Sequence, residues 1–273
     1  MKITYLGTAA AEGFPAVFCN CDHCREAKRL GGQNIRTRSQ TLINADLLID
    51  FPADTYSHFL HNNIDGDKIQ YLLVTHSHLD HFYVDELQMR HGAFAHNMRA
   101  ETLQIYCGTG VAEKIQKADL DTGKNIALTV LKPFDTVKFG SYTATALPAR
   151  HHPGDGALMY IIQGDKTILY AHDTGYFHEE VFNYLQSSGL VLDLVSLDCT
   201  NVDIPISDKG SHMGLPNIER AVNRLTQMGA ITPKTQIVIN HFSHNAEPLQ
   251  SKLETRVAPL GYLVAYDGFS VEV

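Results

Sequence analysis

The sequence contains no tryptophan and no long run of apolar residues among its 273 positions. No stretch approaches the ~18 apolar residues of a membrane-spanning helix, and no secretion signal follows Lys2. Basic residues are also scarce, since 22 Lys and Arg stand against 30 Asp and Glu, which gives a formal charge of -8. We therefore expect a cytoplasmic protein without a membrane partner, and the negative charge argues against a nucleic-acid partner.

Linkers rich in proline, glycine and serine are absent as well, and no internal repeat divides the chain. With 44% hydrophobic residues, the composition predicts a single domain over residues 1–273 with a sizeable core. Short apolar runs alternate with amphipathic stretches, which is typical of a layered α/β protein.

The alternation gives a specific set of expected elements. Strands are predicted at 2–6, 41–43, 47–50, 70–75, 103–107, 126–131, 142–147, 158–163, 167–171, 192–198, 236–239, 262–265 and 269–273. Helices are predicted at 22–30, 53–61, 84–91, 110–118, 178–188, 216–228 and 247–257.

Three of the five cysteines lie within six residues, as Cys19, Cys21 and Cys24. In a cytoplasmic chain, clustered cysteines bind metal more often than they form disulfides, and C-x-C-x2-C can place three thiolates around one zinc ion. The fourth ligand is either His23 or a residue from a distant loop. A distant ligand would tie this zinc-binding loop near 19–24 to the rest of the domain.

The strongest metal-binding motif follows the predicted strand 70–75. It has the pattern H-x-H-x-D-H and consists of His76, His78, Asp80 and His81. Imidazole and carboxylate ligands suit zinc, manganese or iron. Other polar residues also come directly after predicted strands, where loops can gather them at one edge of a sheet. These residues are Asp50, His151, His152, His172, Asp173 and His241.

Together these residues resemble the metallo-β-lactamase superfamily, in which H-x-H-x-D-H is followed by separate His, Asp and His ligands. The resemblance covers essentially the whole chain and implies a four-layer αββα sandwich with the site at one edge. It assigns His76, His78 and His151 to one metal, Asp80, His81 and His241 to a second metal, and Asp173 to both. Asp50 would orient a ligand or the metal-bound water. His152 stays open as an alternative to His151.

Within this superfamily, the chain is most similar to the phosphodiesterases that open phosphoribosyl 1,2-cyclic phosphate in the carbon-phosphorus lyase pathway. The similarity rests on Gly7-Thr8 before the cysteine cluster, on His241-Phe242-Ser243-His244, and on Asp198-Cys199-Thr200 followed by Ser211-His212. It implies that His244 completes a structural zinc site with the three clustered cysteines and that His212 is catalytic. The pyrroloquinoline quinone biosynthesis protein B group is similar in its cysteine cluster and fold.

The resemblance implies an enzyme, a dinuclear metal-dependent phosphoric diester hydrolase. We expect two divalent ions, zinc or manganese, to activate a hydroxide that attacks a small, cyclic phosphodiester, with Asp80 and His212 as catalytic residues. His212 would protonate the leaving alkoxide. The partner would be a small molecule, and the sequence is compatible with a homodimer.

Three alternatives have less support. A ribonuclease Z-like nuclease conflicts with the negative charge, and the cysteine cluster argues against a thioester hydrolase of the glyoxalase II kind. A non-catalytic accessory protein would not need the complete ligand set.

Overall fold

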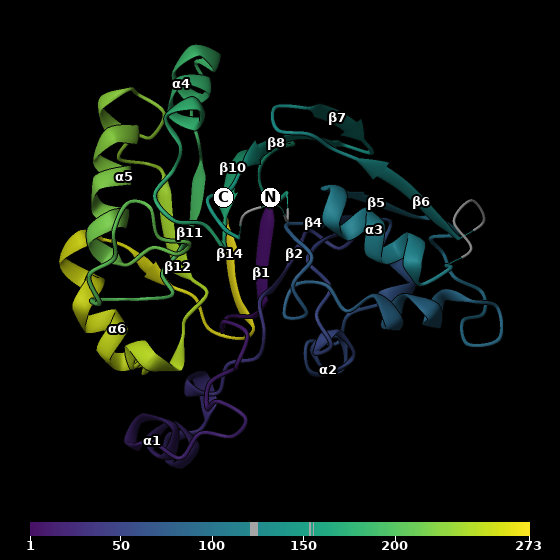
Figure 1. The fold of residues 1–273 in the computed structure, drawn as a ribbon, viewed down its shortest axis with the longest axis horizontal. Helices are drawn as coiled ribbons and strands as arrows, with labels where there is room; N and C mark the ends of the chain where they lie inside the picture. Colours follow the sequence, from purple (N-terminus) through teal and green to yellow (C-terminus); the bar gives the residue numbers. More distant parts are fainter. Residues whose placement is uncertain (121–124, 153, 155) are drawn as a thin grey trace.

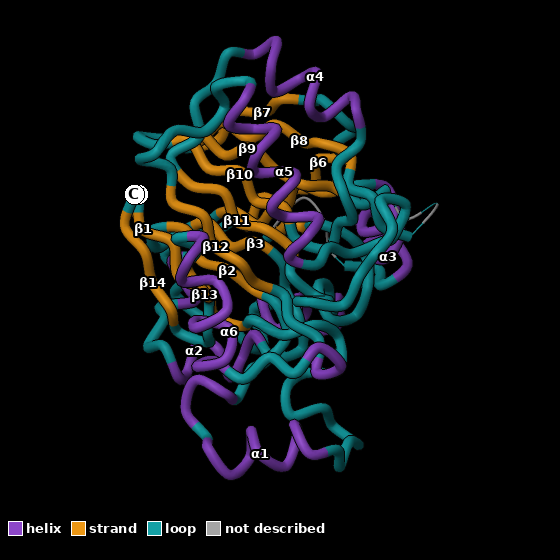
Figure 2. The backbone as a smooth tube through the Cα atoms, turned by 90° about the vertical axis from the view of Figure 1, so that its left-hand side faces the viewer, coloured by secondary structure: helices purple, strands orange, loops and turns teal. Residues whose placement is uncertain are grey.

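The computed structural model describes residues 1–120, 125–152, 154 and 156–273. Over these residues, two mixed β-sheets pack face to face between two layers of helices, which is the predicted four-layer αββα sandwich (Figures 1 and 2). The first sheet has the spatial order β14 (Phe269–Glu272), β1 (Lys2–Gly7), β2 (Gln40–Ile43), β3 (Leu47–Ile49), β4 (Tyr71–Val74), β5 (Leu103–Cys107) and β6 (Ile126–Val130). The second has the order β13 (Leu263–Val264), β12 (Gln236–Asn240), β11 (Leu194–Asp198), β10 (Thr167–Ala171), β9 (Leu158–Gln163), β8 (Tyr142–Pro148) and β7 (Thr136–Phe139).

The strands alternate between two apolar environments because successive side chains point to opposite faces of a sheet. In β4, Leu73 packs between the two sheets, whereas Leu72 faces the outer helices. In β10, Tyr170 lies between the sheets and Leu169 faces outward. Both faces of each sheet are therefore buried, which explains the nearly continuous apolar runs in the sequence.

Helices cover both outer faces, and Figure 1 shows α4, α5 and α6 on one side and α2 and α3 on the other. The α-helices are α1 (Asp22–Leu30), α2 (Thr55–His61), α3 (Thr109–Lys117), α4 (Glu179–Ser188), α5 (Leu215–Gln227) and α6 (Gln250–Val257). The 3₁₀ helices are η1 (Gly32–Asn34), η2 (Gly66–Lys68), η3 (Val84–Arg90), η4 (His244–Ala246) and η5 (Ala258–Leu260). None of the helices in the described ranges has the length and apolarity to cross a membrane.

Apart from the short 3₁₀ helices η1, η2, η4 and η5, which were not predicted, two elements differ from the sequence predictions. The helix predicted at 84–91 is wrong as an α-helix, because this segment is the 3₁₀ helix η3, in which only Leu87 is buried. The edge strand β7 was not predicted, since three of its four residues are at least partly exposed and give little apolar signal.

Parallel pairing brings several strand ends to one edge of the sandwich. In the first sheet β3 pairs in parallel with β4, and in the second β10, β11 and β12 run parallel to one another. Because the carboxyl ends of parallel strands meet at the same edge, the residues that follow these strands lie close together.

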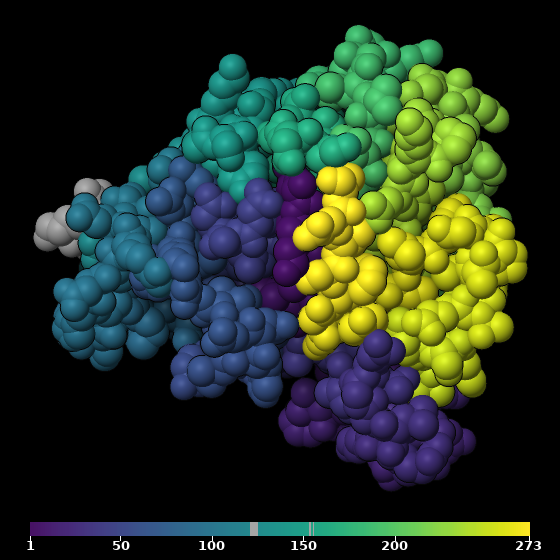
Figure 3. Space-filling view, turned by 180° about the vertical axis from the view of Figure 1, so that it is seen from behind, coloured from purple at the N-terminus to yellow at the C-terminus, as the bar shows by residue number. Residues whose placement is uncertain are grey.

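The N-terminal loop with α1 projects from the body of the sandwich (Figure 3). Its root is joined to the loop after β12, since Phe242 N donates to Thr8 O (3.0 Å) and Ala10 N donates to Phe242 O (3.0 Å). The buried guanidinium of Arg36 lies over the Phe242 ring, 4.6 Å from its centroid, and donates to Ala265 O (2.7 Å). The projecting loop is therefore attached next to the segment that carries His241.

Candidate metal centre

The first cluster of donor atoms combines the loop after β4 with the loops after β8 and β10. It contains His76, His78, His151 and Asp173, whose nearest donor atoms all lie within 4.8 Å of one another. His151 Nε2 is 3.1 Å from His78 Nδ1, and His76 Nε2 is 3.0 Å from Asp173 Oδ2. Four residues from three separate loops thus converge on one point.

The second cluster shares Asp173 with the first and adds Asp80, His81 and His241. His81 Nε2 lies 2.9 Å from Asp173 Oδ2, and His241 Nε2 lies 2.9 Å from Asp173 Oδ1. All four residues are buried. Asp173 therefore directs one carboxylate between two sets of donors, which is the position of a bridging ligand.

The outer ring nitrogens of four histidines have partners of their own. His81 Nδ1 donates to Asp50 Oδ2 (2.7 Å), His241 Nδ1 lies 2.8 Å from Thr200 Oγ1, His76 Nδ1 lies 3.1 Å from Thr75 Oγ1, and His151 Nδ1 lies 3.3 Å from Ser211 O. A partner on Nδ1 places the proton there and leaves the Nε2 lone pair directed into the site. His78 differs, because its Nδ1 faces the cluster.

Charge in the site favours bound cations. Burial disfavours the charged form of His81, but Asp173, Asp50 and Asp80 outweigh this and raise its pKa well above the usual value. Burial likewise opposes ionisation of Asp173, yet His241 and His81 hold its pKa well below its usual range. A divalent ion would replace the proton of His81 on the side that faces the cluster, because a ligating histidine must be neutral. Burial lowers the pKa of His151 to about 4, so this ring is neutral without a bound ion.

Two buried atoms test whether metal ions fit this site. Among the described residues, His76 Nε2 and Asp173 Oδ1 are buried and form no hydrogen bond of acceptable geometry. Each nevertheless lies about as close to another donor-cluster atom as a hydrogen bond requires, since His76 Nε2 is 3.0 Å from Asp173 Oδ2 and His241 Nε2 is 2.9 Å from Asp173 Oδ1. A buried polar atom without a hydrogen-bond partner lowers the free energy of unfolding by about 1–3 kcal/mol. Both atoms belong to the donor clusters, and a divalent cation would satisfy them. The imidazole and carboxylate donors therefore fit two divalent ions bridged by Asp173.

A third group lies beside the shared carboxylate. His212 Nδ1 donates to Asp198 Oδ2 (2.9 Å) and lies 3.4 Å from Asp173 Oδ1. Asp198 is fully buried and also accepts hydrogen bonds from the amides of Thr200 (3.0 Å) and Met213 (3.1 Å). Burial disfavours the charged form of His212, but Asp198 and Asp173 outweigh this and raise its pKa to about 9. The contact with Asp198 fixes the ring and leaves Nε2 as the atom that can exchange a proton with a substrate.

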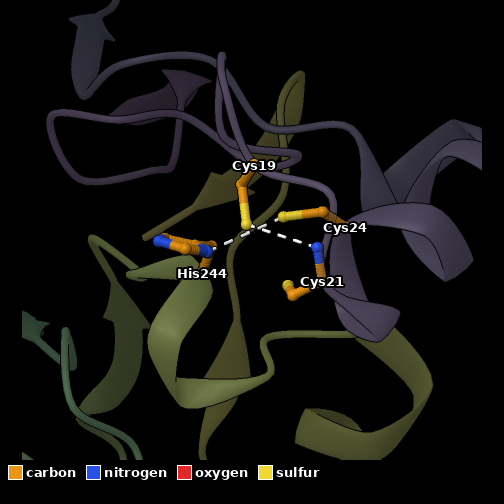
Figure 4. Close-up of side chains that lie close together, drawn as sticks. All are labelled: Cys19, Cys21, Cys24 and His244. Carbon is orange, nitrogen blue, oxygen red and sulfur yellow. Dashed lines mark hydrogen bonds between the residues drawn. The ribbon is translucent and has the colours of Figure 1, made fainter.

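The cysteine cluster lies apart from these groups. Cys19, Cys21, Cys24 and His244 have donor atoms within 4.8 Å of one another, and Figure 4 shows the four side chains gathered around one point. Cys24 Sγ is 3.7 Å from His244 Nδ1. A hydrogen bond from the backbone of Cys24, together with the His244 side chain, lowers the pKa of the Cys21 thiol to about 6, which favours the thiolate that binds zinc. Three thiolates and one imidazole match a structural zinc site.

Several candidate residues lie outside the clusters. His23 Nε2 instead pairs with Glu247 Oε1 (2.8 Å), so the distant His244 takes the fourth position in the cysteine cluster. His152 is exposed and is not part of any donor cluster in the described residues, whereas His151 is. His172 lies between the sheets, 2.7 Å from Ser196 Oγ.

Two residues of the site, Asp198 and Thr200, were part of the segment that carries the family resemblance, but the sequence analysis assigned them no role in the site. Asp198 ends the apolar strand β11, just as Asp50 follows β3, so the same strand-end signal would have identified it. Thr200 contacts both His241 and His212 through its hydroxyl, and only the folded chain shows these contacts.

An αββα sandwich with His and Asp donors at one sheet edge defines the metallo-β-lactamase fold, whose members are generally hydrolases with divalent metals. The model of the beta-lactamase superfamily domain matches residues 46–270, and the chain therefore belongs to this superfamily.

Comparison with individual proteins gives several relatives with different activities. Coenzyme PQQ synthesis protein B of Acinetobacter baylyi is 25% identical over 314 aligned positions that cover both chains completely. A diphosphatase of the PhnP family has a TM-score of 0.75 at 18% identity, covering 100% of this chain and 97% of that one. Zn²⁺-bound PqqB from Methylobacterium extorquens has a TM-score of 0.76 at 16% identity over both entire chains. The short form of human tRNase Z has a TM-score of 0.68 at 14% identity, covering 100% of this chain and 99% of that one.

Replacement of Asp50 by asparagine tests the hydrogen bond to His81. The change keeps the shape of the side chain but removes the negative charge next to His81 Nδ1, and such changes typically cost about 10–100-fold in metal affinity or activity. We expect weaker zinc binding of this size in a chelator competition titration. Asp65→Asn, at an exposed ion pair with Lys68, is the matched control and should bind zinc as the unmodified protein does. Equal zinc affinity of the Asp50 variant would contradict the assigned role.

Proposed function

We propose that this protein is a dinuclear metal-dependent phosphodiesterase that hydrolyses a small, cyclic phosphodiester. The observation that carries the proposal is the pair of donor clusters that share Asp173, with His212 directly beside the shared carboxylate. When bound, two divalent ions supply an activated water and neutralise the charge of the phosphoryl oxygens.

The residues of the chain itself then have separate tasks. The donors of both clusters hold the ions, and Asp50 and Thr200 orient His81 and His241. Asp198 holds the His212 ring by its Nδ1 atom. The Nε2 atom of His212 then donates a proton to the departing alkoxide, which prevents the build-up of charge on a poor leaving group.

Three observations support a small substrate and phosphate chemistry. The chain carries a formal charge of -8, which does not favour a long polyanion such as RNA. A phosphate ester is a natural target for two adjacent cations with a proton donor beside them. The fold is also similar to a diphosphatase of the PhnP family, although that likeness is a likeness of fold.

A role in cofactor biosynthesis is the competing possibility, because coenzyme PQQ synthesis protein B is similar to this chain over its full length. A protein with that role would hold the metals without hydrolysing a phosphodiester. A screen with a 2′,3′-cyclic nucleotide, a nucleoside diphosphate ester and a thioester separates these options. Hydrolysis of the cyclic substrate alone supports the proposal, whereas turnover of another substrate alone, or of none, contradicts it.

Replacement of His212 by alanine tests the proton donor. General acids contribute typically ~10²–10⁴ in rate, so we expect a loss of this size in kcat on a substrate with an alkoxide leaving group. Metal content, measured by elemental analysis, should not change, because His76, His81 and His241 remain in place. His61→Ala, on the exposed face of α2, is the control and should not alter turnover. A His212 variant with unreduced turnover would exclude His212 as the proton donor.

A further inference from the structure

Two glycines bring the loop of Asp173 into direct backbone contact with the loop of His212. Gly175 lies two residues after Asp173, and Gly210 lies two residues before His212. A Cβ atom placed on Gly175 would lie 1.8 Å from the carbonyl oxygen of Gly210 and 2.9 Å from its carbonyl carbon. Real Cβ atoms essentially never come within 3.0 Å of a heavy atom outside their own residue and its chain neighbours. Only glycine therefore fits at position 175.

The opposing atoms cannot yield easily, because they are backbone atoms. Gly210 N donates to Ser207 O (2.8 Å), which fixes the turn that presents its carbonyl. Arg150 also restricts movement of Gly175. The amide of Gly175 donates to Arg150 O (2.8 Å), and a Cβ placed on Gly175 would lie 3.1 Å from Arg150 Cδ. A side chain at 175 would therefore push the segment 207–212 away from the Asp173 loop.

This displacement would act on His212. The ring lies 3.4 Å from Asp173 Oδ1, and the adjacent Ser211 carbonyl lies 3.3 Å from His151 Nδ1. No side chain separates the two loops at Gly175 and Gly210, so their backbone contact sets how closely His212 approaches the shared carboxylate. We propose that Gly175 is a positioning residue that holds the His212 loop against the Asp173 loop. The inference rests on the proposed function, in which His212 protonates the leaving group.

Replacement of Gly175 by alanine tests the role in turnover, with two substrates that differ in their need for a proton donor. A 2′,3′-cyclic nucleotide releases an alkoxide, whereas bis-p-nitrophenyl phosphate releases p-nitrophenolate, which departs without protonation. Because a general acid contributes ~10²–10⁴, its partial displacement should lower kcat on the cyclic nucleotide at least ~10-fold. KM should change little, and the loss on the aryl ester should be smaller. Metal content in excess metal should match that of the unmodified protein, because the displacement removes no donor and affects only the 3.3 Å contact between Ser211 O and His151 Nδ1.

A double-mutant comparison shows whether Gly175 acts through His212. If it does, Gly175→Ala should cause no further loss in the His212→Ala background, because the positioned group is already absent. Gly92→Ala is the matched control, since a Cβ at Gly92 would meet no atom within 4 Å and its backbone does not require glycine. This control should keep the kcat of the unmodified protein.

Several results would overturn the inference. They are an unreduced kcat on the cyclic nucleotide, equal losses on both substrates, an additive loss in the double variant, or loss of metal from Gly175→Ala. If Gly175→Ala does not fold, Gly210→Ala moves the same segment with a milder clash, because its Cβ would meet Ile206 Cγ2 at 2.4 Å and Ser207 O at 3.1 Å. It should lower kcat on the cyclic nucleotide in the same direction, and an unreduced kcat would again overturn the inference.

A crystal structure of Gly175→Ala separates this inference from the proposed function. We expect a separation between His212 Nδ1 and Asp173 Oδ1 that is clearly longer than 3.4 Å. An unchanged separation would overturn the inference whatever the enzyme hydrolyses. If the unmodified protein hydrolyses neither substrate, the proposed function fails, but a displaced His212 would still support Gly175 as the residue that sets this separation.

Discussion

Replacement of Asp173 by alanine is expected to release both ions of the dinuclear centre and to lower phosphodiester hydrolysis at least about a thousandfold. Asp173 is the only residue that belongs to both donor clusters among the described residues, and its oxygens lie 2.9 Å from the Nε2 atoms of His81 and His241. A metal ion supplies several kcal/mol of transition-state stabilisation, and about 4 kcal/mol corresponds to a thousandfold in rate. Elemental analysis and steady-state kinetics measure the two effects.

The control for this experiment is Asp203→Ala, which removes an exposed carboxylate paired with Arg256. This variant should keep both the metal content and the turnover of the unmodified protein. The cysteine cluster does not contain Asp173, so its zinc should remain bound in the Asp173 variant. An Asp173→Ala protein that keeps both centre ions and full turnover would exclude a bridging role.

Replacement of Cys21 by serine is expected to have the largest effect on stability. The change removes one of three thiolates from the cluster that joins the projecting loop to His244. The free energy of binding structural zinc is also folding free energy, so its loss should reduce the free energy of unfolding by several kcal/mol. Urea unfolding and zinc content per chain measure the result. The effect on kcat should be small beside the effect on the free energy of unfolding, because the dinuclear centre keeps all its donors.

A buried cysteine outside the cluster provides the control. Cys107 lies in β5, in the apolar layer between the first sheet and its outer helices. Cys107→Ala should cost roughly 1 kcal/mol and leave zinc content unchanged. Equal zinc content and an equal unfolding midpoint for Cys21→Ser and the unmodified protein would contradict a structural zinc site.

The sequence predicted the parts of the fold that have a strong apolar signal. The runs at β4, β10 and β12 are buried on both faces, and the polar residues after them marked the sheet edge where His76, Asp173 and His241 lie. The prediction failed at η3, where the apolar residues Val84 and Leu87 are three positions apart. That spacing suits the three residues per turn of a 3₁₀ helix, and it also occurs on one face of an α-helix.

Contacts that depend on tertiary structure could not be predicted in the same way. Thr200 reaches His241 only because β11 and β12 are parallel neighbours, and a threonine after a strand has no special meaning in a sequence. The contact between Gly175 and Gly210 could not be predicted from the sequence either. Both glycines look like ordinary loop residues there, and neither has a positive φ in the structure. The cysteine spacing alone left the fourth ligand open between His23 and a distant residue, and only the family resemblance implied His244. The fold places the loop after β12, with His244, beside the cysteines.

The most direct test of the central claim is hydrolysis of bis-p-nitrophenyl phosphate by manganese- or zinc-loaded protein, compared with the Asp80→Ala variant. Asp80 is a buried donor of the second cluster. The proposed function predicts hydrolysis by the loaded protein and its loss in the variant, together with lower metal content. A protein that carries both centre ions and the structural zinc but does not hydrolyse this ester would contradict a phosphodiesterase.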